Sequence, residues 1–307
     1  MNKKFILLVS IAILVIGADV IFYYQKHKAT DDGGKMFVTT SFYPMYFFAQ
    51  EIGGNKAEVI NITPAGAEPP DYELTGQDIV KIQSSRILII NGGRLEPWGD
   101  KITQELQGSK TTIIVAGQNL TNRQGVDENG KPIIDPHVWL DPILAKKEAE
   151  KIAQGFISTD PVNASYYKTN LQKLESDLDQ LDQAYRQGFA SCRQNSFITS
   201  HAAFGYLASE YHLNQIAILG VSPDEEPSGK KLTEISQTVQ KNGIKIIFFE
   251  SLVSPKLSET IAAETGAKTM VLNPIEGLTD TDLSQGKSYL TEMQQNLKNL
   301  KIALQCQ

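Results

Sequence analysis

The chain lacks the excess of positive charge that nucleic-acid-binding proteins carry. Its 29 lysines and arginines are outnumbered by 35 aspartates and glutamates, which gives a formal net charge of -6. A phosphate backbone is bound by a basic protein surface, so this balance predicts no nucleic-acid partner. A cationic or neutral ligand suits the chain better.

The chain also lacks the composition of a disordered protein or of a protein with many membrane spans. Hydrophobic residues make up 41% of it and charged residues 21%, as in ordinary globular proteins. A length of 307 residues is enough for two lobes that each bury a core. We therefore expect a packed fold of more than one unit.

One long apolar run stands at the N-terminus, where it predicts export. Lysines precede an apolar stretch at residues 5–18, which continues past Asp19 into an aromatic cluster. Counted through that cluster, the run approaches the ~20 residues of a membrane-spanning helix, whereas counted to Asp19 it is the core of a signal peptide cleaved near Ala18. Residues 1–24 are thus predicted to be a signal peptide or a membrane anchor, and residues 25–35 a flexible tether. The folded body would then be extracytoplasmic, at the cell surface or in the periplasm.

Cysteine is scarce, and the two that occur, Cys192 and Cys306, lie far apart in the sequence. In an exported protein such a pair can form a disulfide, and two unpaired thiols are the alternative. A bridge would close a loop of roughly a hundred residues and contribute on the order of 4 to 5 kcal/mol in the chain-entropy model. It would also fix the C-terminus to the second half of the protein.

Short β-rich apolar runs alternate with helical patterns along the rest of the chain. This alternation predicts an α/β fold with two lobes, each built on a four-stranded, mainly parallel sheet flanked by helices. We place the N-terminal lobe at residues 36–158 and the C-terminal lobe at residues 191–307. The predicted strands lie at residues 36–42, 59–62, 87–90, 112–115, 196–199, 215–219, 245–249 and 269–272.

A single long helix is predicted between the lobes, within residues 159–190. It opens at Asp160 and Pro161, and leucines spaced three and four residues apart form one narrow apolar stripe. At 1.5 Å per residue such a helix would be about 40 Å long, enough to span both lobes as a rigid connection. A coiled-coil dimer seam is the alternative, although the pattern lasts barely two heptads.

Two of the four histidines follow predicted strand ends, one in each lobe. In open parallel sheets ligands bind beyond the carboxyl ends of the strands, so His137, His201 and Glu276 are expected to face one cleft. Imidazole and carboxylate together are ligands of a borderline transition metal, zinc before others, and two nitrogens argue against calcium or magnesium. These three residues are therefore the predicted metal ligands.

Several blocks of sequence in one order carry a family resemblance. They lie at residues 41–44, 64–72, 91–92 with 96–98, 135–142, 200–207, 226–228, 249–251 and 272–277. With them the chain resembles the metal-specific solute-binding proteins of ABC importers, the zinc and manganese receptors, over nearly all of its length beyond the N-terminal segment. The resemblance implies two lobes joined by a long rigid helix, a divalent metal in the cleft and delivery to an ABC permease in the membrane. We expect a monomer that has no enzyme activity.

The resemblance carries the family's histidine and carboxylate ligands onto His137, His201 and Glu276, but the first ligand is missing. The family stretch reads Glu-Pro-His-Asp-Tyr-Glu, and Pro70 stands here in place of its histidine. Proline offers no lone pair to a metal, so a coordination position stays open. Glu68 and Asp71 are the candidate substitutes, and water is the alternative. Oxygen in place of nitrogen would soften the preference for zinc and admit Mn²⁺.

Two other functions remain open at this stage. Two histidines, a glutamate and an open position also describe a hydrolytic zinc site, with Glu250 or Glu226 as the general base. Against an enzyme, the chain has no His-Glu-x-x-His motif and no nucleophile elbow. The second alternative, suggested by Pro70, is a metal-free adhesin or interaction module on the same scaffold.

Overall fold

The structure is a computed structural model that describes residues 34–126, 131–223 and 227–307. The predicted export segment, most of the predicted tether and Glu226 lie outside these ranges. Within them, no helix is both long and apolar enough to cross a membrane.

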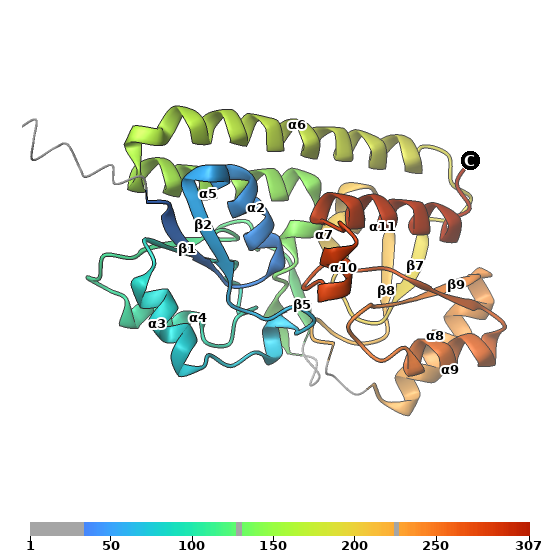
Figure 1. The fold of residues 1–307 in the computed structure, drawn as a ribbon. Helices are drawn as coiled ribbons and strands as arrows, with labels where there is room; N and C mark the ends of the chain where they lie inside the picture. The colour runs from blue at the N-terminus through green and yellow to red at the C-terminus, as the bar shows by residue number, and fades with distance from the viewer. Residues whose placement is uncertain (1–33, 127–130, 224–226) are drawn as a thin grey trace, which may run out of the picture. The chain divides into compact units, whose positions relative to one another are not determined.

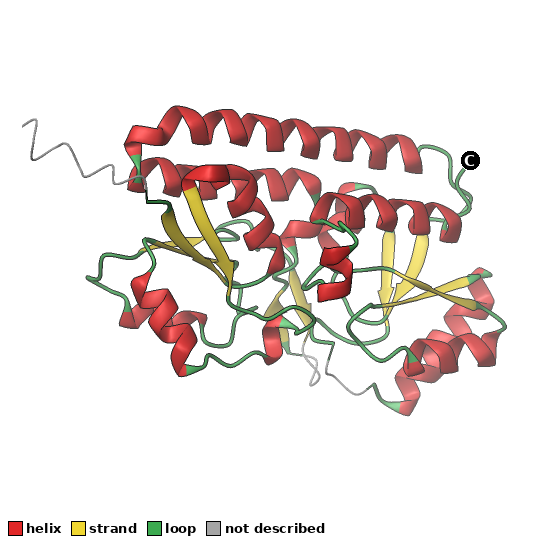
Figure 2. Ribbon diagram, viewed as in Figure 1, coloured by secondary structure: helices red, strands yellow, loops and turns green. Residues whose placement is uncertain are grey.

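The first half of the body forms a parallel sheet of four strands. Their spatial order is β2-β1-β3-β4, and every neighbouring pair is parallel. The strands are β1 (Met36–Thr40), β2 (Ala57–Asn61), β3 (Ile87–Ile90) and β4 (Thr112–Val115). The helices of this half are α2 (Tyr43–Gly53), α3 (Gly76–Ser84), α4 (Gly99–Glu105) and α5 (Pro142–Thr159), drawn in Figures 1 and 2.

Strand β3 shows why this sheet needs a helix layer on each face. Its four residues are all buried, and alternate residues of a strand point to opposite faces. Ile87 and Ile89 pack into a core with residues of α2 and α5, whereas Leu88 and Ile90 pack with residues of α3 and α4. An unbroken apolar run is therefore the sequence that this central strand requires.

The second half repeats the arrangement with the strand order β10-β9-β7-β8, again with parallel pairs. The strands are β7 (Ser196–Thr199), β8 (Asn214–Ala217), β9 (Ile246–Phe249) and β10 (Lys268–Val271). The helices are α7 (Gly205–Glu210), α8 (Gly229–Asn242), α9 (Lys256–Thr265), α10 (Asp280–Ser284) and α11 (Tyr289–Ala303). The predicted fold class, two four-stranded lobes flanked by helices, is confirmed.

Helix α6 (Ala164–Phe189) packs against elements of both lobes. It contacts α2 and α5 of the first lobe and α11 of the second, and it runs past both sheets in Figure 1. It begins four residues later than predicted, because residues Pro161–Asn163 form a 3₁₀ turn. The predicted apolar stripe is buried within the chain, so it does not provide a coiled-coil seam.

A short antiparallel hairpin was not predicted. It consists of β5 (Gln124–Val126) and β6 (Pro132–Ile134). No strand is predicted between β4 and α5, since strands of three residues carry no alternating pattern. The hairpin leads directly into the segment that bears His137.

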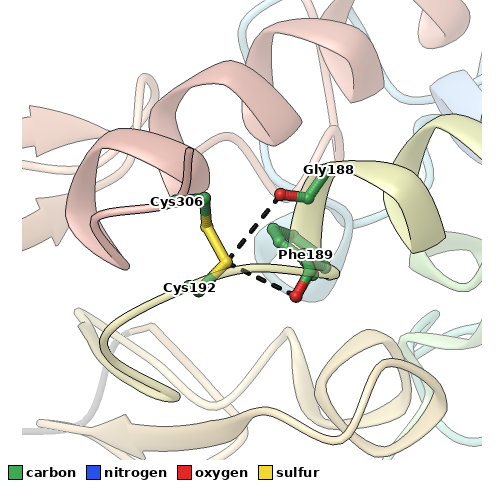
Figure 3. Close-up of a disulfide and its surroundings, with 4 residues drawn as sticks. All are labelled: Gly188, Phe189, Cys192 and Cys306. Carbon is green, nitrogen blue, oxygen red and sulfur yellow. Dashed lines mark hydrogen bonds between the residues drawn. A yellow bond between two sulfur atoms is a disulfide. The ribbon is translucent and has the colours of Figure 1, made fainter.

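The predicted disulfide is present and joins Cys192 to Cys306. Figure 3 shows it beside the end of α6, where Cys192 Sγ lies 3.5 Å from the carbonyl oxygen of Phe189. The two cysteines also face each other in an isolated β-bridge. The bridge therefore attaches the chain segment after α11 to the segment after α6.

Candidate metal centre

The structure brings the three predicted ligands together. His137 Nε2 lies 3.0 Å from Glu276 Oε1 and 3.3 Å from His201 Nε2, and His201 Nε2 lies 3.5 Å from Glu276 Oε1. These residues come from the segment after β6, from the end of β7 and from the loop after β10. All three are buried, with at most 2% of their surface exposed.

This triangle has the dimensions of one face of a zinc tetrahedron. Zinc binds imidazole nitrogen and carboxylate oxygen at about 2.0 to 2.2 Å, so two of its tetrahedral ligands lie roughly 3.3 to 3.6 Å apart. The three observed separations fall at or just below that range. A divalent ion would therefore fit with little movement of the side chains.

Hydrogen bonds to carboxylates fix which nitrogen of each imidazole faces the centre. His137 Nδ1 lies 2.9 Å from Asp135 Oδ1, and His201 Nδ1 lies 2.7 Å from Glu250 Oε1. Because a carboxylate accepts, each Nδ1 carries the hydrogen, and each neutral ring presents the lone pair of Nε2 to the other. Two lone pairs that face each other at 3.3 Å need a cation or a proton between them.

The charges around the histidines favour a cation at this point. Burial lowers the pKa of His137, but hydrogen bonds with Asp135 and Glu276 outweigh it and hold that pKa above its usual value. Burial also lowers the pKa of His201, yet the charges of Glu250 and Glu276 raise it well above that value. The carboxylates that raise these pKa values would favour a metal cation at the same point.

The carboxylate of Glu276 is held ionised in the same way. Burial raises its pKa, but the hydrogen bonds and charges of His137 and His201 bring that pKa down to about 2. Its second oxygen, Oε2, is buried and has no hydrogen-bond partner among the described residues. An acceptor atom without a donor beside two imidazole nitrogens fits a metal ligand.

The loop that bears Glu276 is held rigidly by side-chain hydrogen bonds. The amide of Asn273 donates to Asn296 Oδ1 at 2.8 Å, and the amide of Ile275 donates to Asn273 Oδ1 at 2.8 Å. Ile275 has a φ of 60°, a backbone conformation that is unusual for a β-branched residue. This strained turn aims Glu276 into the centre, and Asn273 stays outside the ligand cluster.

The segment that bears His137 is fixed by residues whose part the sequence did not reveal. Glu96 is buried, and its carboxylate accepts hydrogen bonds from Ser41 Oγ at 2.6 Å and from the amides of Asn91 and Gly92. Asn91 Nδ2 in turn donates to the carbonyl of Pro136, the residue before His137, at 3.0 Å. Ser41, Asn91 and Glu96, which lie in the matching blocks, therefore position the segment that bears His137.

Trp139 joins the two lobes beneath the cluster. Its indole Nε1 donates to the carbonyl of Pro274 at 2.8 Å, and its own carbonyl accepts from Tyr289 Oη at 2.5 Å. Its ring centroid lies 5.1 Å from that of His137. The ligand-bearing segments of both lobes thus share one buried anchor.

The candidate substitutes for the missing histidine are not brought into the cluster. Pro70 lies in a 3₁₀ turn at Pro69–Asp71, where Asp71 is exposed and Glu68 is half-buried. Among the described residues, the one group of three or more His, Cys, Asp or Glu residues whose ligand atoms all lie within 4.8 Å of one another is His137, His201 and Glu276. Pro70 does line the same cavity as His137, a space of about 400 Å³.

Glu250, one of the two predicted general bases, is already engaged. Its Oε1 accepts hydrogen bonds from Ser200 Oγ, from the amide of His201 and from His201 Nδ1. It lies behind the imidazole ring rather than on the side of the ring that faces the centre. This position suits a residue that orients a ligand.

Known proteins are similar to this chain in sequence and in fold. The high-affinity zinc uptake system protein ZnuA of Bacillus subtilis is 36% identical, with 91% of each chain covered. The zinc-binding protein AdcA of Streptococcus pyogenes is also 36% identical over 98% of this chain, which spans only 62% of that longer relative. The Zn(II)-bound ZnuA-like domain of Streptococcus pneumoniae AdcA superposes with a TM-score of 0.76, at 38% identity and with 88% and 99% of the two chains covered.

The family model that matches this chain is described as zinc-uptake complex component A, periplasmic. The match runs over residues 38–303, almost the whole folded body. The resemblance to metal-specific solute-binding proteins is thereby confirmed. The chain belongs to the periplasmic zinc-uptake complex component A family.

Proposed function

We propose that the protein captures Zn²⁺ between its lobes with His137, His201 and Glu276 and delivers the ion to an ABC permease. The observation that supports this most strongly is the triangle of 3.0, 3.3 and 3.5 Å between their ligand atoms. Asp135 and Glu250 hold both rings in the tautomer that zinc requires. Mn²⁺ is the second candidate ion, because the fourth position lacks a protein nitrogen.

The arrangement suits capture and release better than hydrolysis. Both carboxylates beside the imidazoles already accept Nδ1 hydrogens, so neither is placed to deprotonate a metal-bound water. The zinc ion exchanges with the protons that the two imidazoles carry in its absence. A protein with these properties can load and unload its ion without chemical change.

Zinc titration of the chelator-stripped protein tests metal capture. Because a ligand that binds only the folded state raises the unfolding midpoint, we expect Zn²⁺ to raise the Tm of the full chain and His137→Ala to remove the effect. The matched control is His212→Ala, since His212 is an exposed histidine outside the cluster. A Tm that no divalent ion shifts would contradict capture and favour the metal-free adhesin.

Delivery to a permease needs a test in cells. We expect cells from which this gene is deleted to accumulate less zinc from zinc-poor medium, and the wild-type gene to restore uptake. A gene that encodes His201→Ala should fail to restore it, although the protein is present at the same level. Restoration by that variant would show that uptake does not pass through this site.

The N-terminal segment is proposed to hold the body outside the cytoplasmic membrane. The apolar run of residues 5–18 and its aromatic continuation support this role. Cell fractionation distinguishes an anchor from a cleaved signal peptide, because an anchored chain stays with the membranes and keeps its first residues. A mature protein that begins just after Ala18 and is released from the cells would establish cleavage.

A further inference from the structure

We propose that a small carboxylate anion from solution completes the zinc coordination, with one oxygen on the ion and the other on the guanidinium of Arg94. This inference rests on the proposed function, because the anion binds only where zinc is held. It concerns the position that Pro70 leaves without a protein ligand. With an anion bound at that position, the protein would be a receptor for zinc together with a carboxylate.

The cavity beside the cluster is the first observation that supports the anion. Pro70, Arg94 and His137 all line this space of about 400 Å³. It is large enough for several water molecules or for one small organic anion. The side chain of Pro70 offers no lone pair, and a ligand that enters from the cavity could fill this side of the zinc ion.

The second observation is that the charge of Arg94 is unpaired among the described residues. The side chain is exposed, and its guanidinium makes no hydrogen bond or ion pair with a residue in the described part of the chain. Its φ of 67° follows two glycines at 82° and 67°, in a region of backbone conformation that favours glycine. A costly backbone position that keeps a long cationic side chain at a ligand cavity points to a function for that side chain.

The charges around the ion give the third observation. The two positive charges of zinc and that of Arg123, which lies 3.5 Å from Asp135, balance the carboxylates of Glu276, Asp135 and Glu250. Arg94, in contrast, forms no ion pair with a carboxylate of the described residues. A carboxylate from solution would neutralise its charge, and an arginine fork matches the geometry of a carboxylate.

The walls of the cavity favour an organic anion. Besides Arg94 and His137, the lining includes apolar residues such as Leu95, Ile133 and Val221. Apolar walls exclude water and strengthen the attraction between the anion and the two cations. They also contact the carbon body of an organic acid, which an inorganic ion lacks.

The test measures how acetate changes zinc affinity at constant ionic strength. Acetate binds free zinc weakly, so it serves as a probe that does not strip the ion from the protein. Binding of acetate and of zinc is reciprocal, so we expect millimolar acetate to tighten zinc binding about five- to tenfold. The Co²⁺-loaded protein gives a second readout, since its visible absorption should change as acetate enters the coordination shell.

Variants at the cavity test whether the effect of acetate on zinc affinity depends on Arg94 and on the open coordination position. Arg94→Gln should remove the dependence on acetate, and Pro70→His should remove it as well because the new imidazole fills the open position. Arg193→Gln is the matched control, since Arg193 is an exposed arginine outside the cavity, and it should keep the dependence. Equal dependence in Arg94→Gln and in the wild type would overturn the assignment of Arg94.

The same titrations distinguish a carboxylate of the chain from a carboxylate from solution, and failure of the anion proposal from failure of the proposed zinc binding. A carboxylate of the chain itself would be revealed if Glu68→Gln or Asp71→Asn weakened zinc binding while acetate had no effect, and this result would overturn the anion. Zinc binding that is tight but indifferent to acetate in every variant would overturn the anion and leave the proposed function intact. A wild-type protein that binds no zinc with or without acetate would instead overturn the proposed function.

Discussion

On the side of the centre formed by the C-terminal lobe, each ligand is locked by side-chain hydrogen bonds, whereas the side formed by Pro70 and Arg94 faces a cavity. Glu250 fixes His201, and the amides of Asn273 and Ile275 fix the turn before Glu276. Pro70 contributes no donor atom, and Arg94 has no partner among the described residues. The locked side supplies protein ligands in fixed positions. On the open side, the molecule that enters the cavity supplies the remaining ligand, and it therefore affects zinc affinity and metal preference.

The largest effect is expected from a substitution that breaks the locked side. His201→Ala removes a nitrogen ligand and should weaken zinc binding by more than about 100-fold, beyond the usual effect of losing an outer-shell partner. Pro70→Ala, on the open side, should leave the affinity almost unchanged. Competition titrations with a zinc-binding dye measure both, and similar losses in the two variants would remove the distinction between the sides.

A substitution that supplies a ligand on the open side should increase zinc affinity. Pro70→His supplies the imidazole that the family stretch carries at this position, and we expect zinc affinity to rise on the order of tenfold or more. The gain should be smaller for Mn²⁺, because an added nitrogen favours zinc. An unchanged zinc affinity would mean that residue 70 does not reach the ion.

The carboxylates behind the histidines should have intermediate effects. Glu250→Gln and Asp135→Asn keep the shape of the side chain but weaken its hold on the imidazole, and each should cost about 10- to 100-fold in zinc affinity. Calorimetric titration measures the loss, and the unfolding midpoint without metal checks that each variant is folded. If Glu250→Gln binds zinc as tightly as the wild type, orientation by this carboxylate is not needed.

The pH dependence should differ between the metal-free and the zinc-bound protein. The pKa values of His137 and His201 are raised in the folded protein, so their contribution to stability without metal is fully present below about pH 6.5 and is lost as the pH rises through the raised values. Zinc requires the neutral rings, so the rise in Tm that zinc causes should grow with pH over the same interval. A rise in Tm that is constant with pH would show that no proton is displaced.

The pKa of Glu276 adds a second, acidic limit. That pKa is about 2 in the folded protein and 4.5 ordinarily, so its contribution is present above pH 4.5 and is lost as the pH falls toward 2. Thermal unfolding of the metal-free Glu276→Gln variant should therefore show a weaker dependence on acid than the wild type. Identical acid profiles would place this carboxylate outside the charge balance of the centre.

The smallest effect on zinc binding is expected from the disulfide, which lies away from both sides of the centre. Replacement of Cys192 and Cys306 by serine should lower the free energy of unfolding by about 4 to 5 kcal/mol, because the bridge closes a loop of more than a hundred residues. Zinc affinity of the folded variant should be unchanged. A large loss of affinity would mean that the disulfide shapes the cleft.

Much of the fold could be predicted because the strands buried on both faces are short, continuous apolar runs, which the sequence shows directly. The bounds of β3, β4 and β7 match the predicted ranges, since each is a continuous apolar or β-branched run between polar turns. The hairpin β5–β6 was missed because strands of three residues are too short to show alternation. The 3₁₀ turn before α6 was missed because its sequence, Pro161–Asn163, also suits the first turn of an α-helix.

The ligand cluster could be predicted for a topological reason. The carboxyl ends of parallel strands meet at one edge of each sheet, and His201 and Glu276 follow the ends of β7 and β10. The residues that orient the cluster could not be found in this way. Glu96 acts through contacts 4 to 55 residues away in the sequence, Glu250 through contacts 49 to 50 residues away and Asn296 through a contact 23 residues away. The folded chain is needed to reveal these roles.

Trp139 has a consequence for the path of the ion. Its indole holds the carbonyl of Pro274 and its carbonyl holds the hydroxyl of Tyr289, so the two lobes are pinned together along the inner edge of the cleft. Of the three ligands, only His137 borders the cavity that Pro70 and Arg94 line. Exchange of the ion past His137 would then depend on what occupies this cavity.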